Sequence, residues 1–195
     1  IESEIKNYKK PYGLIDFTDM LEKFLQQHRD EIPKFKVIFV DEAQDLSLIQ
    51  WSIKEKLEKD TGCDVCVAGD DDKAIFVWAG ANVEKFRSFA TREGFETEIL
   101  KQSYRVPKKM HTLAERIIEK DWTRLPKEYL PVDREGDIMR AITFGGLVPP
   151  LKEFIDNNNS KTVLVLGATN SILKEPISAL KSAGIKYDSR NSKPM

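Results

Sequence analysis

The sequence predicts an α/β protein whose strands form parallel sheet. Two short apolar runs, at residues 37–40 and 65–68, each end at acidic residues. Segments with helical spacing of apolar residues lie between and beyond these runs, so strands and helices alternate along the chain. Such alternation is typical of a parallel sheet covered by helices, in which buried strands read as continuous apolar runs. In this class, ligands bind beyond the carboxyl ends of the strands.

Six elements are expected in the first block of the chain. Ser47 and Gln50 have the spacing of a capping box, which opens a helix. Pro33 ends the helix before them, whose apolar residues form one stripe. We expect helices at 14–28, 47–59 and 83–92, strands buried on both faces at 37–40 and 65–68, and a further strand at 97–101.

The second block begins at a seam near residues 103–107. Pro107 suits the first turn of a helix, and Asn170 and Gly184 suit the start and end of the last helix. We expect helices at 107–118, 147–155 and 170–183, strands at 138–142 and 162–166, and an irregular segment at 121–136.

Composition excludes several classes of protein. Of the 195 residues, 41% are hydrophobic and 32% are charged, which is typical of a soluble globular protein. The formal net charge of −1 provides no overall basic field for nucleic acid, although a local basic surface is compatible with it. No apolar run is long enough for a membrane span and no secretory leader is visible, so we expect a cytoplasmic protein with no membrane partner.

Two cysteines, Cys63 and Cys66, have CxxC spacing. A structural zinc site needs four ligands, and the sequence holds no second pair. We therefore expect both to be buried, free cysteines in a reducing cytosol.

Two acidic residues follow the first predicted strand. Asp41 and Glu42 open the segment Asp41-Glu42-Ala43-Gln44-Asp45. At a strand end, an Asp can hold Mg²⁺ and a Glu can orient and deprotonate an attacking water. An acidic loop before a helix would have the same pattern, so this segment alone does not decide between the two.

A charged turn with aromatic residues follows the second predicted strand. Residues 69–81 read Gly-Asp-Asp-Asp-Lys-Ala-Ile-Phe-Val-Trp-Ala-Gly-Ala. In an extended segment, Phe76 and Trp78 would project to the same side, where exposed rings can stack on unpaired bases. Burial in the core is the alternative role for these two rings.

Tyr104 and Arg105 close the segment at residues 100–105, at the seam between the blocks. An arginine at such a seam can reach a phosphate across a cleft, as an arginine finger does. A surface ion pair is the alternative role for Arg105.

Together these segments resemble the UvrD/Rep family of superfamily 1 DNA helicases. The resemblance assigns residues 41–45 to motif II (the Walker B segment), residues 69–81 to motif III, residues 100–105 to motif IV, and residues 16–21 to the DFxDLL segment that precedes motif II. It implies incomplete RecA-like motor domains of the P-loop NTPase type. Residues 1–103 would form the rear of the first motor domain, and residues 104–195 the start of the second.

The resemblance also implies a role for each candidate residue. Asp41 would hold Mg²⁺, Glu42 would activate water, Gln44 would link the nucleotide state to the motor, Tyr104 would pack on the adenine of ATP, and Arg105 would reach the γ-phosphate. Lys73 and Asp70 of motif III are further candidates for nucleotide binding. Trp78, with Phe76 beside it, would stack on single-stranded DNA.

Three positions depart from the usual family pattern: Lys73 replaces a Gln that senses the γ-phosphate, Ala79 replaces an Arg, and Ser103 replaces the Asn of motif IV. A lysine can contact a phosphate but cannot accept a hydrogen bond. These changes indicate a divergent member of the family.

No glycine is followed by lysine, so the GxxxxGK[ST] loop that cradles phosphates is absent. We expect a fragment that is inactive alone and belongs to an ATP-dependent DNA helicase that moves on single-stranded DNA and unwinds duplex. Its partners would be single-stranded DNA, ATP and the remainder of the helicase chain. Exposed apolar sheet also predicts self-association of the fragment.

Other functions fit the same motifs. One is a non-catalytic nucleic-acid-binding or interaction module derived from a helicase, which Lys73 and Ala79 favour. Another is a helicase-like part of a RecB/AddA-type nuclease subunit, which flanking sequence would distinguish. A third is an unrelated α/β domain with accidental matches.

Overall fold

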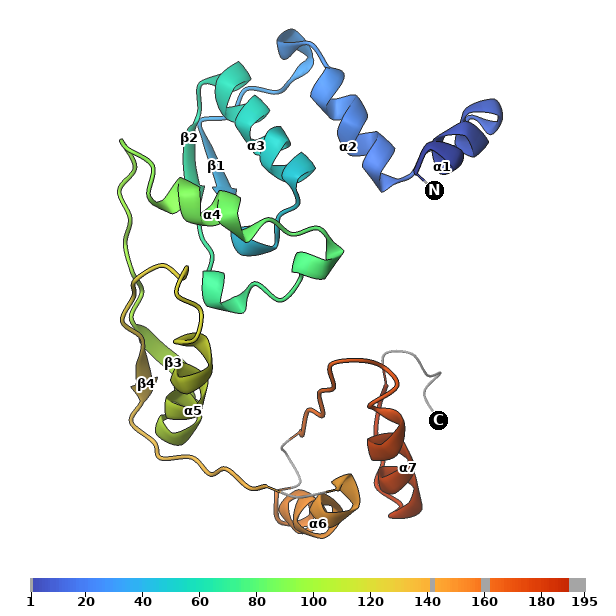
Figure 1. The fold of residues 1–195 in the computed structure, drawn as a ribbon, viewed down its shortest axis with the longest axis vertical. Coiled ribbons are helices and arrows are strands. Elements are labelled where there is room, and N and C mark those ends of the chain that lie inside the picture. Colours follow the sequence, from blue (N-terminus) through green and yellow to red (C-terminus); the bar gives the residue numbers. More distant parts are fainter. Residues whose placement is uncertain (1, 141–142, 159–161, 190–195) are drawn as a thin grey trace. The chain divides into compact units, whose positions relative to one another are not determined.

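The structure, a computed structural model, describes residues 2–140, 143–158 and 162–189. The chain forms two compact units, Ile1–Gly136 and Asp137–Met195, called unit 1 and unit 2 below (Figure 1). The seam between motor domains expected at residues 103–104 lies inside unit 1, and that division stays a prediction.

Unit 1 alternates helices and strands, as a mixed α/β protein does. Its α-helices are α1 (Glu2–Lys9), α2 (Phe17–Gln26), α3 (Leu48–Thr61), α4 (Val83–Ala90) and α5 (Lys108–Ile118). Its strands are β1 (Val37–Val40), β2 (Asp64–Val67), β3 (Gln102–Pro107) and β4 (Leu130–Val132). Short 3-10 helices are η1 (Lys10–Tyr12), η2 (Arg29–Glu31), η3 (Ala43–Asp45), η4 (Asp71–Lys73) and η5 (Val77–Ala79).

The strands form two parallel pairs. β1 pairs with β2, and Val40 lies opposite Val67 at the carboxyl ends. β3 pairs with β4 and has an irregular register between its two ends. Parallel pairing confirms the coarse expectation, and it brings the segments after β1 and β2 to the same edge of their sheet.

The core of unit 1 lies at that edge. Ala43 of η3, Trp51 of α3 and Phe86 of α4 are buried against one another, and Figure 1 shows both helices beside the strands. The partly buried side chains packed on this cluster are Val40, Leu46, Val67, Phe89 and Leu125. Leu125 belongs to residues 121–127, here called the return segment, which follow α5 and come back to the first block of the chain.

Helix starts follow the expected local chemistry. Asp16 and Asp19 form a capping box at the start of α2, and Lys9 contacts both carboxylates at 2.8 and 2.6 Å. Ser47 and Gln50 form the capping box expected for α3, which ends at Gly62 in the left-handed region.

Two expectations for the strands of unit 1 are wrong. Residues 97–101 form no strand, because β3 begins at Gln102, where Leu130 supplies its pairing partner. β1 and β2 are not buried on both faces either: Phe39 is 78% exposed, and Cys66 is exposed, as is Ala68 just after β2. Successive side chains alternate between faces, so Val40 reaches the core while Phe39 lies opposite.

Unit 2 is helical in its described part, with η6 (Phe144–Leu147), α6 (Val148–Asn157) and α7 (Lys174–Ser182). The strand expected at 162–166 is not formed, because no described strand of unit 2 supplies its hydrogen bonds. Residues 138–140 are not a strand either, and 141–142 lie outside the described residues. Asn170 lies in a turn rather than at a helix start, whereas Gly184 follows α7 with a φ of 68° as expected.

The two cysteines differ in burial. Both are free; Cys63 is buried, but Cys66 on β2 is exposed, so the expectation of two buried cysteines is wrong for Cys66. In the part of the chain that the structure describes, every helix is too short or too polar to span a membrane.

Candidate nucleotide and nucleic-acid site

The acidic pair of motif II lies at the exposed end of β1. Asp41 and Glu42 are both exposed, and the Asp41 carboxylate accepts a hydrogen bond from the Glu42 amide at 2.9 Å. Glu42 has a φ of 49°, and among the described residues it is the one residue other than glycine whose backbone is left-handed. This conformation is uncommon outside glycine and costs free energy, so the surrounding structure must hold it.

Gln44 connects motif II with motif III. Its side chain is 1% exposed, its Nε2 donates to a carboxylate oxygen of Glu42 at 2.7 Å, and its Oε1 accepts from the Asp70 amide at 3.0 Å. A buried amide with both ends satisfied is held in one orientation. The Gln44 side chain therefore links the segment that follows β1 to the segment that follows β2, and it also holds the Glu42 carboxylate.

Gly69 makes this link sterically possible. A Cβ at Gly69 would lie 2.8 Å from Gln44 Oε1 and 2.8 Å from a ring carbon of Phe86. These distances are shorter than van der Waals contact, so a larger residue would displace the Gln44 side chain or the core ring.

Residues 70–72, here called the acidic turn, follow directly. The Asp71 carboxylate is buried, and one oxygen accepts from Arg87 Nε at 3.0 Å and from the Leu125 amide at 2.8 Å. Its other oxygen contacts Lys127 Nζ. Burial raises the pKa of Asp71, but the hydrogen bonds from Lys127, Leu125 and Arg87 together lower it below its usual range.

Lys127 contacts all three carboxylates of the acidic turn. Its Nζ lies 2.9 Å from Asp70 Oδ1 and 3.0 Å from Asp72 Oδ2, in addition to its contact with Asp71. Arg124 forms two parallel hydrogen bonds with Asp72, at 2.9 and 2.7 Å. The carboxylates lie close enough to hold a metal ion, but the lysine ammonium already meets each of them. The three carboxylates of the acidic turn therefore suit the Lys127 ammonium better than a metal ion.

The motif III aromatics are outside the core. Trp78 is 83% exposed and Phe76 is 44% exposed, and their ring centroids are 6.5 Å apart. The segment is the short helix η5 rather than an extended strand, yet it still places the rings together. Lys73 Nζ lies 3.3 Å from Asp70 Oδ2, so its charge is turned toward the acidic turn.

Motif IV occupies β3. Tyr104 and Arg105 are exposed, and the buried Ser103 hydroxyl accepts hydrogen bonds from the Arg105 and Val106 amides at 3.2 and 3.0 Å. Within the described residues, the Arg105 guanidinium has no ion pair. Motifs II and III are therefore joined by hydrogen bonds, whereas no such bond ties the Arg105 side chain to them.

The return segment was not expected from the sequence to belong to this site. Residues 121–136 were expected only as an irregular segment, although Arg124 and Lys127 contact motif III directly. The three adjacent aspartates could have predicted that cationic side chains from elsewhere in the chain pack here, because clustered carboxylates need cations nearby.

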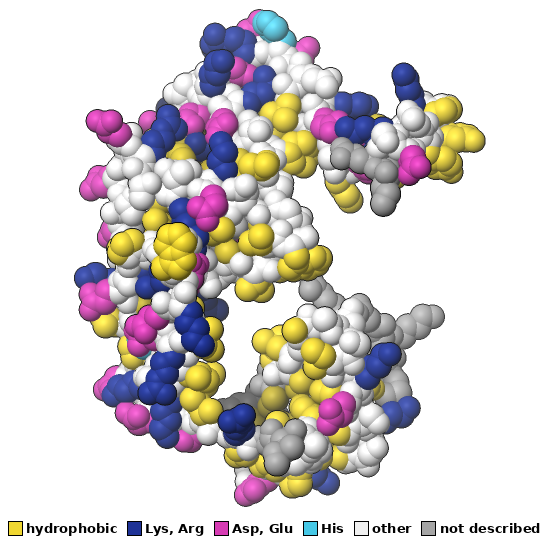
Figure 2. All heavy atoms as spheres, viewed as in Figure 1, with side chains coloured by type: hydrophobic (Ala, Val, Ile, Leu, Met, Phe, Trp, Pro, Cys, Tyr) yellow, Lys and Arg dark blue, Asp and Glu magenta, His cyan; other side chains and the backbone are white. Residues whose placement is uncertain are grey.

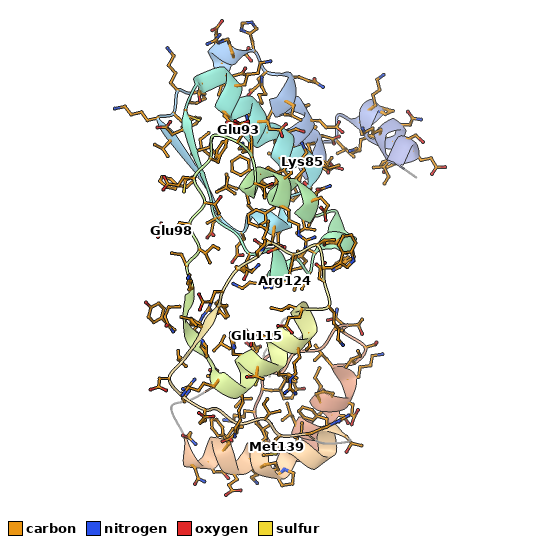
Figure 3. All side chains as sticks on the ribbon, turned by 60° about the vertical axis from the view of Figure 1, so that its left-hand side comes forward. Lys85, Glu93, Glu98, Glu115, Arg124 and Met139 are labelled. Carbon is orange, nitrogen blue, oxygen red and sulfur yellow. The ribbon has the colours of Figure 1, made fainter. Side chains whose placement is uncertain are left out.

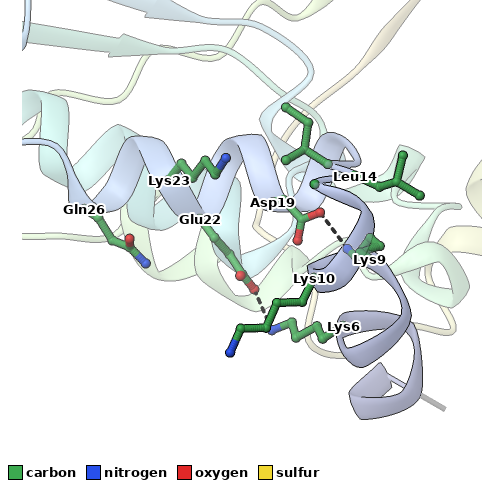
Figure 4. Close-up of a pocket in the computed structure, with 10 residues that line it drawn as sticks. Lys6, Lys9, Lys10, Leu14, Asp19, Glu22, Lys23 and Gln26 are labelled. Carbon is green, nitrogen blue, oxygen red and sulfur yellow. Dashed lines mark hydrogen bonds and ion pairs between the residues drawn. The ribbon is translucent and has the colours of Figure 1, made fainter.

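A hollow of about 430 Å³ lies between α1 and α2 (Figure 4). Two of its lysines meet acids at its wall: Lys9 contacts Asp19 at 2.6 Å, and Lys6 contacts Glu22 at 3.1 Å. Lys10 and Lys23 also line the hollow, so its four lysines outnumber its two acids. Figure 2 also shows basic and acidic side chains intermixed on the face drawn.

The parallel α/β unit ties acids at the end of one strand to a charged and aromatic turn at the end of the next, at the edge where ligands bind in this class of fold. Comparisons with known proteins point to a family. The profile of the UvrD/REP helicase N-terminal domain matches residues 1–93.

Curated relatives match a larger share of the chain than this profile does. DNA helicase II of Escherichia coli (strain K12) is 35% identical over 136 residues, which cover 64% of this chain and 18% of that protein. ATP-dependent DNA helicase PcrA of Bacillus subtilis (strain 168) is 29% identical over 131 residues, covering 63% of this chain and 18% of the relative. ATP-dependent DNA helicase PcrA of Staphylococcus epidermidis is 34% identical over 107 residues, which cover 53% of this chain and 14% of that protein.

The profile match and these relatives together support a UvrD/Rep-type helicase fragment. The chain spans less than a fifth of the length of these relatives. The resemblance read from motifs II to IV is thus confirmed.

Proposed function

We propose that this chain supplies the water-activating side of a nucleotide site, coupled to a single-stranded DNA contact, in an ATP-dependent DNA helicase or translocase. The observation that carries the proposal is the double hydrogen bond of Gln44, to Glu42 at 2.7 Å and to the Asp70 amide at 3.0 Å. Through this side chain, a change at the nucleotide can move the turn that leads to the aromatic pair.

Asp41 fits a Mg²⁺ ligand by its chemistry and position. Its carboxylate is exposed at a strand end, and one of its two oxygens accepts the Glu42 amide, which leaves the other available. Bound Mg²⁺ would neutralise charge on the ATP phosphates. In this proposal Glu42, which accepts a hydrogen bond from Gln44, orients the attacking water and accepts its proton.

Apart from the half-buried Asp70, the remaining candidates face solvent, where a nucleotide or DNA can reach them. Tyr104 offers a ring for the adenine and Arg105 a guanidinium for the γ-phosphate. Lys73 and Asp70 lie beside each other at the acidic turn and would adjoin the phosphates. Trp78, with Phe76 at 6.5 Å, forms the platform for unpaired bases.

Binding of a fluorescein-labelled oligothymidine, followed by anisotropy, tests the DNA contact. Stacking on an aromatic side chain is worth roughly 1–3 kcal/mol per base, so Trp78→Ala should weaken binding by about 5- to 150-fold. Trp122→Ala is the matched control, because Trp122 is also highly exposed, at 91% against 83% for Trp78, but lies on the return segment. Equal affinity of the Trp78→Ala variant and the unaltered chain would refute this role.

Steady-state hydrolysis of ATP tests the other half of the proposal. Because these 195 residues contain no GxxxxGK[ST] loop, the chain alone should show no magnesium-dependent turnover. Turnover by the chain alone that disappears in Glu42→Gln would overturn this expectation. In a longer chain that includes the loop, Glu42→Gln should retain nucleotide binding and lose hydrolysis.

A non-catalytic nucleic-acid-binding or interaction module derived from a helicase is the second candidate. The contact of Lys73 with Asp70 at 3.3 Å favours it, because a carboxylate of the acidic turn partly offsets the charge of this exposed lysine. Failure of the longer chain to hydrolyse ATP, with DNA binding intact, would support this second function. If the chain is instead part of a RecB/AddA-type nuclease subunit, the longer chain should show nuclease activity. For each of these functions we propose a cytoplasmic location.

Self-association of the chain is a further part of the proposal. Phe17 and Phe39 are among the large apolar side chains left exposed on unit 1, and such surfaces favour association. Light scattering should show oligomers that dissociate on dilution, and a monomer at high concentration would contradict this.

A further inference from the structure

The return segment is fastened to motif III at several points. Arg87 of α4 donates to Asp121 at 2.7 Å and to Thr123 at 2.6 Å, while its Nε holds Asp71. Leu125 places its side chain on the core cluster and its amide on Asp71. Hydrogen bonds from Thr123 and then Arg87 lower the pKa of Asp121 to about 2, in keeping with a carboxylate held charged.

Two cations of the return segment complete the attachment. Arg124, labelled in Figure 3, binds Asp72 through two parallel hydrogen bonds, and Lys127 meets all three carboxylates of the acidic turn. Burial lowers the pKa of Lys127, but the hydrogen bonds with Asp71, Asp70 and Asp72 raise it overall. The lysine therefore stays charged at neutral pH.

This attachment continues to the nucleotide side and to motif IV. Asp70, whose carboxylate contacts Lys127 at 2.9 Å, is the residue whose amide binds Gln44. Three residues after Lys127, β4 begins and pairs with β3, which carries Tyr104 and Arg105. One short stretch of chain thus joins the acidic turn to the strand of motif IV.

We propose that Lys127 and Arg124 are positioning residues, which hold the acidic turn so that the Asp70 amide keeps Gln44 on Glu42 and the aromatic pair stays presented. Their predicted effect on DNA binding rests on the proposed function above, whereas their effect on the turn does not. The two residues act through carboxylates and would not need to touch nucleotide or DNA. Motif IV is thereby connected to motifs II and III by the return segment even though the Arg105 side chain does not contact them.

Amide hydrogen exchange and NMR chemical shifts of the 195-residue chain test the positioning. In Lys127→Met, exchange of the Leu125 and Asp70 amides should accelerate at least tenfold, and the side-chain amide signals of Gln44 should shift. Lys101→Met is the matched control, because it removes the same charge from an exposed pair with Glu128 at 2.8 Å. The control should leave the exchange rates and the Gln44 signals unchanged.

A loss of stability in Lys127→Met without any change at Asp70 or Gln44 would show a merely structural ion pair and overturn the proposal. If Lys127→Met does not fold, Arg124→Lys supplies the second test, because it keeps the charge but cannot keep the two parallel hydrogen bonds to Asp72. It should accelerate exchange of the Leu125 amide several-fold, and unchanged exchange would also overturn the proposal.

Oligothymidine affinity, measured on the same variants, separates this inference from the proposed function. The positioning predicts a loss of about tenfold in Lys127→Met and none in Lys101→Met. Weakened binding with unchanged Asp70 and Gln44 signals would mean that Lys127 contacts DNA directly, which contradicts the positioning role. The opposite combination is also informative. If the Asp70 and Gln44 signals shift in Lys127→Met but Trp78→Ala binds DNA as the unaltered chain does, the proposed DNA contact is refuted and the positioning role stands.

Discussion

Replacing Asp71 by alanine should lower the free energy of unfolding of unit 1 by about 3 kcal/mol, and the contacts of the carboxylate explain this magnitude. Removing one partner of a buried ion pair costs roughly 3–5 kcal/mol when the other charge is left unpaired. In Asp71→Ala, Arg87 still has its ion pair with Asp121 at 2.7 Å, and Lys127 still has its ion pair with Asp72 at 3.0 Å. These remaining pairs reduce the cost. The Leu125 amide loses its acceptor, which adds roughly 1–3 kcal/mol.

Urea-induced unfolding followed by far-ultraviolet circular dichroism measures this loss. Glu128→Ala is the control, because Glu128 forms an exposed pair with Lys101 at 2.8 Å and such pairs contribute roughly 0.2–1 kcal/mol. Equal destabilisation by Asp71→Ala and Glu128→Ala would refute the reasoning, since it would mean that burial and the shared donors add nothing.

Three further outcomes follow from the same region. Gly69→Ala should destabilise the protein by roughly 1–3 kcal/mol, because its Cβ would lie 2.8 Å from Gln44 Oε1; an unchanged thermal midpoint would contradict this. Trp51→Ala should cost roughly 3–5 kcal/mol in urea titrations, because this side chain is 2% exposed, and a cost below that of Glu128→Ala would speak against the assigned core. Although burial raises the pKa of Asp71, its hydrogen-bonded donors lower it overall. Its contribution is therefore present above its unfolded pKa of about 3.9 and is lost as pH falls through the folded value. Unfolding titrations from pH 7 to pH 2.5 should show a decline in stability that is shallower in Asp71→Ala.

The elements whose formation depends on neighbouring residues could be predicted from the sequence. The capping box predicted from Ser47 and Gln50 is a short-range pattern, and the structure contains it at the start of α3. β1 and β2 are apolar runs between turns, and their parallel pairing follows from the helix that connects them. The family resemblance was likewise carried by local motifs, and the match of residues 1–93 confirms it.

Elements that need a distant partner were predicted poorly. Residues 162–166 have a strand-like sequence but form no strand, because a strand exists only where a neighbour accepts its hydrogen bonds. β3 begins at Gln102 rather than at residue 97 because β4 pairs with it there.

By itself, the sequence determined the α/β class, the positions of the acidic and aromatic motifs, and the helicase family, because each depends on residue types at short spacing. Only the tertiary structure showed that Gln44 joins Glu42 to the Asp70 amide and that Lys127 meets the acidic turn. The latter contact joins residues more than fifty positions apart, which no local pattern specifies. Its physical cause is that three neighbouring carboxylates beside a buried core must be neutralised by whichever cations the folded chain brings to them.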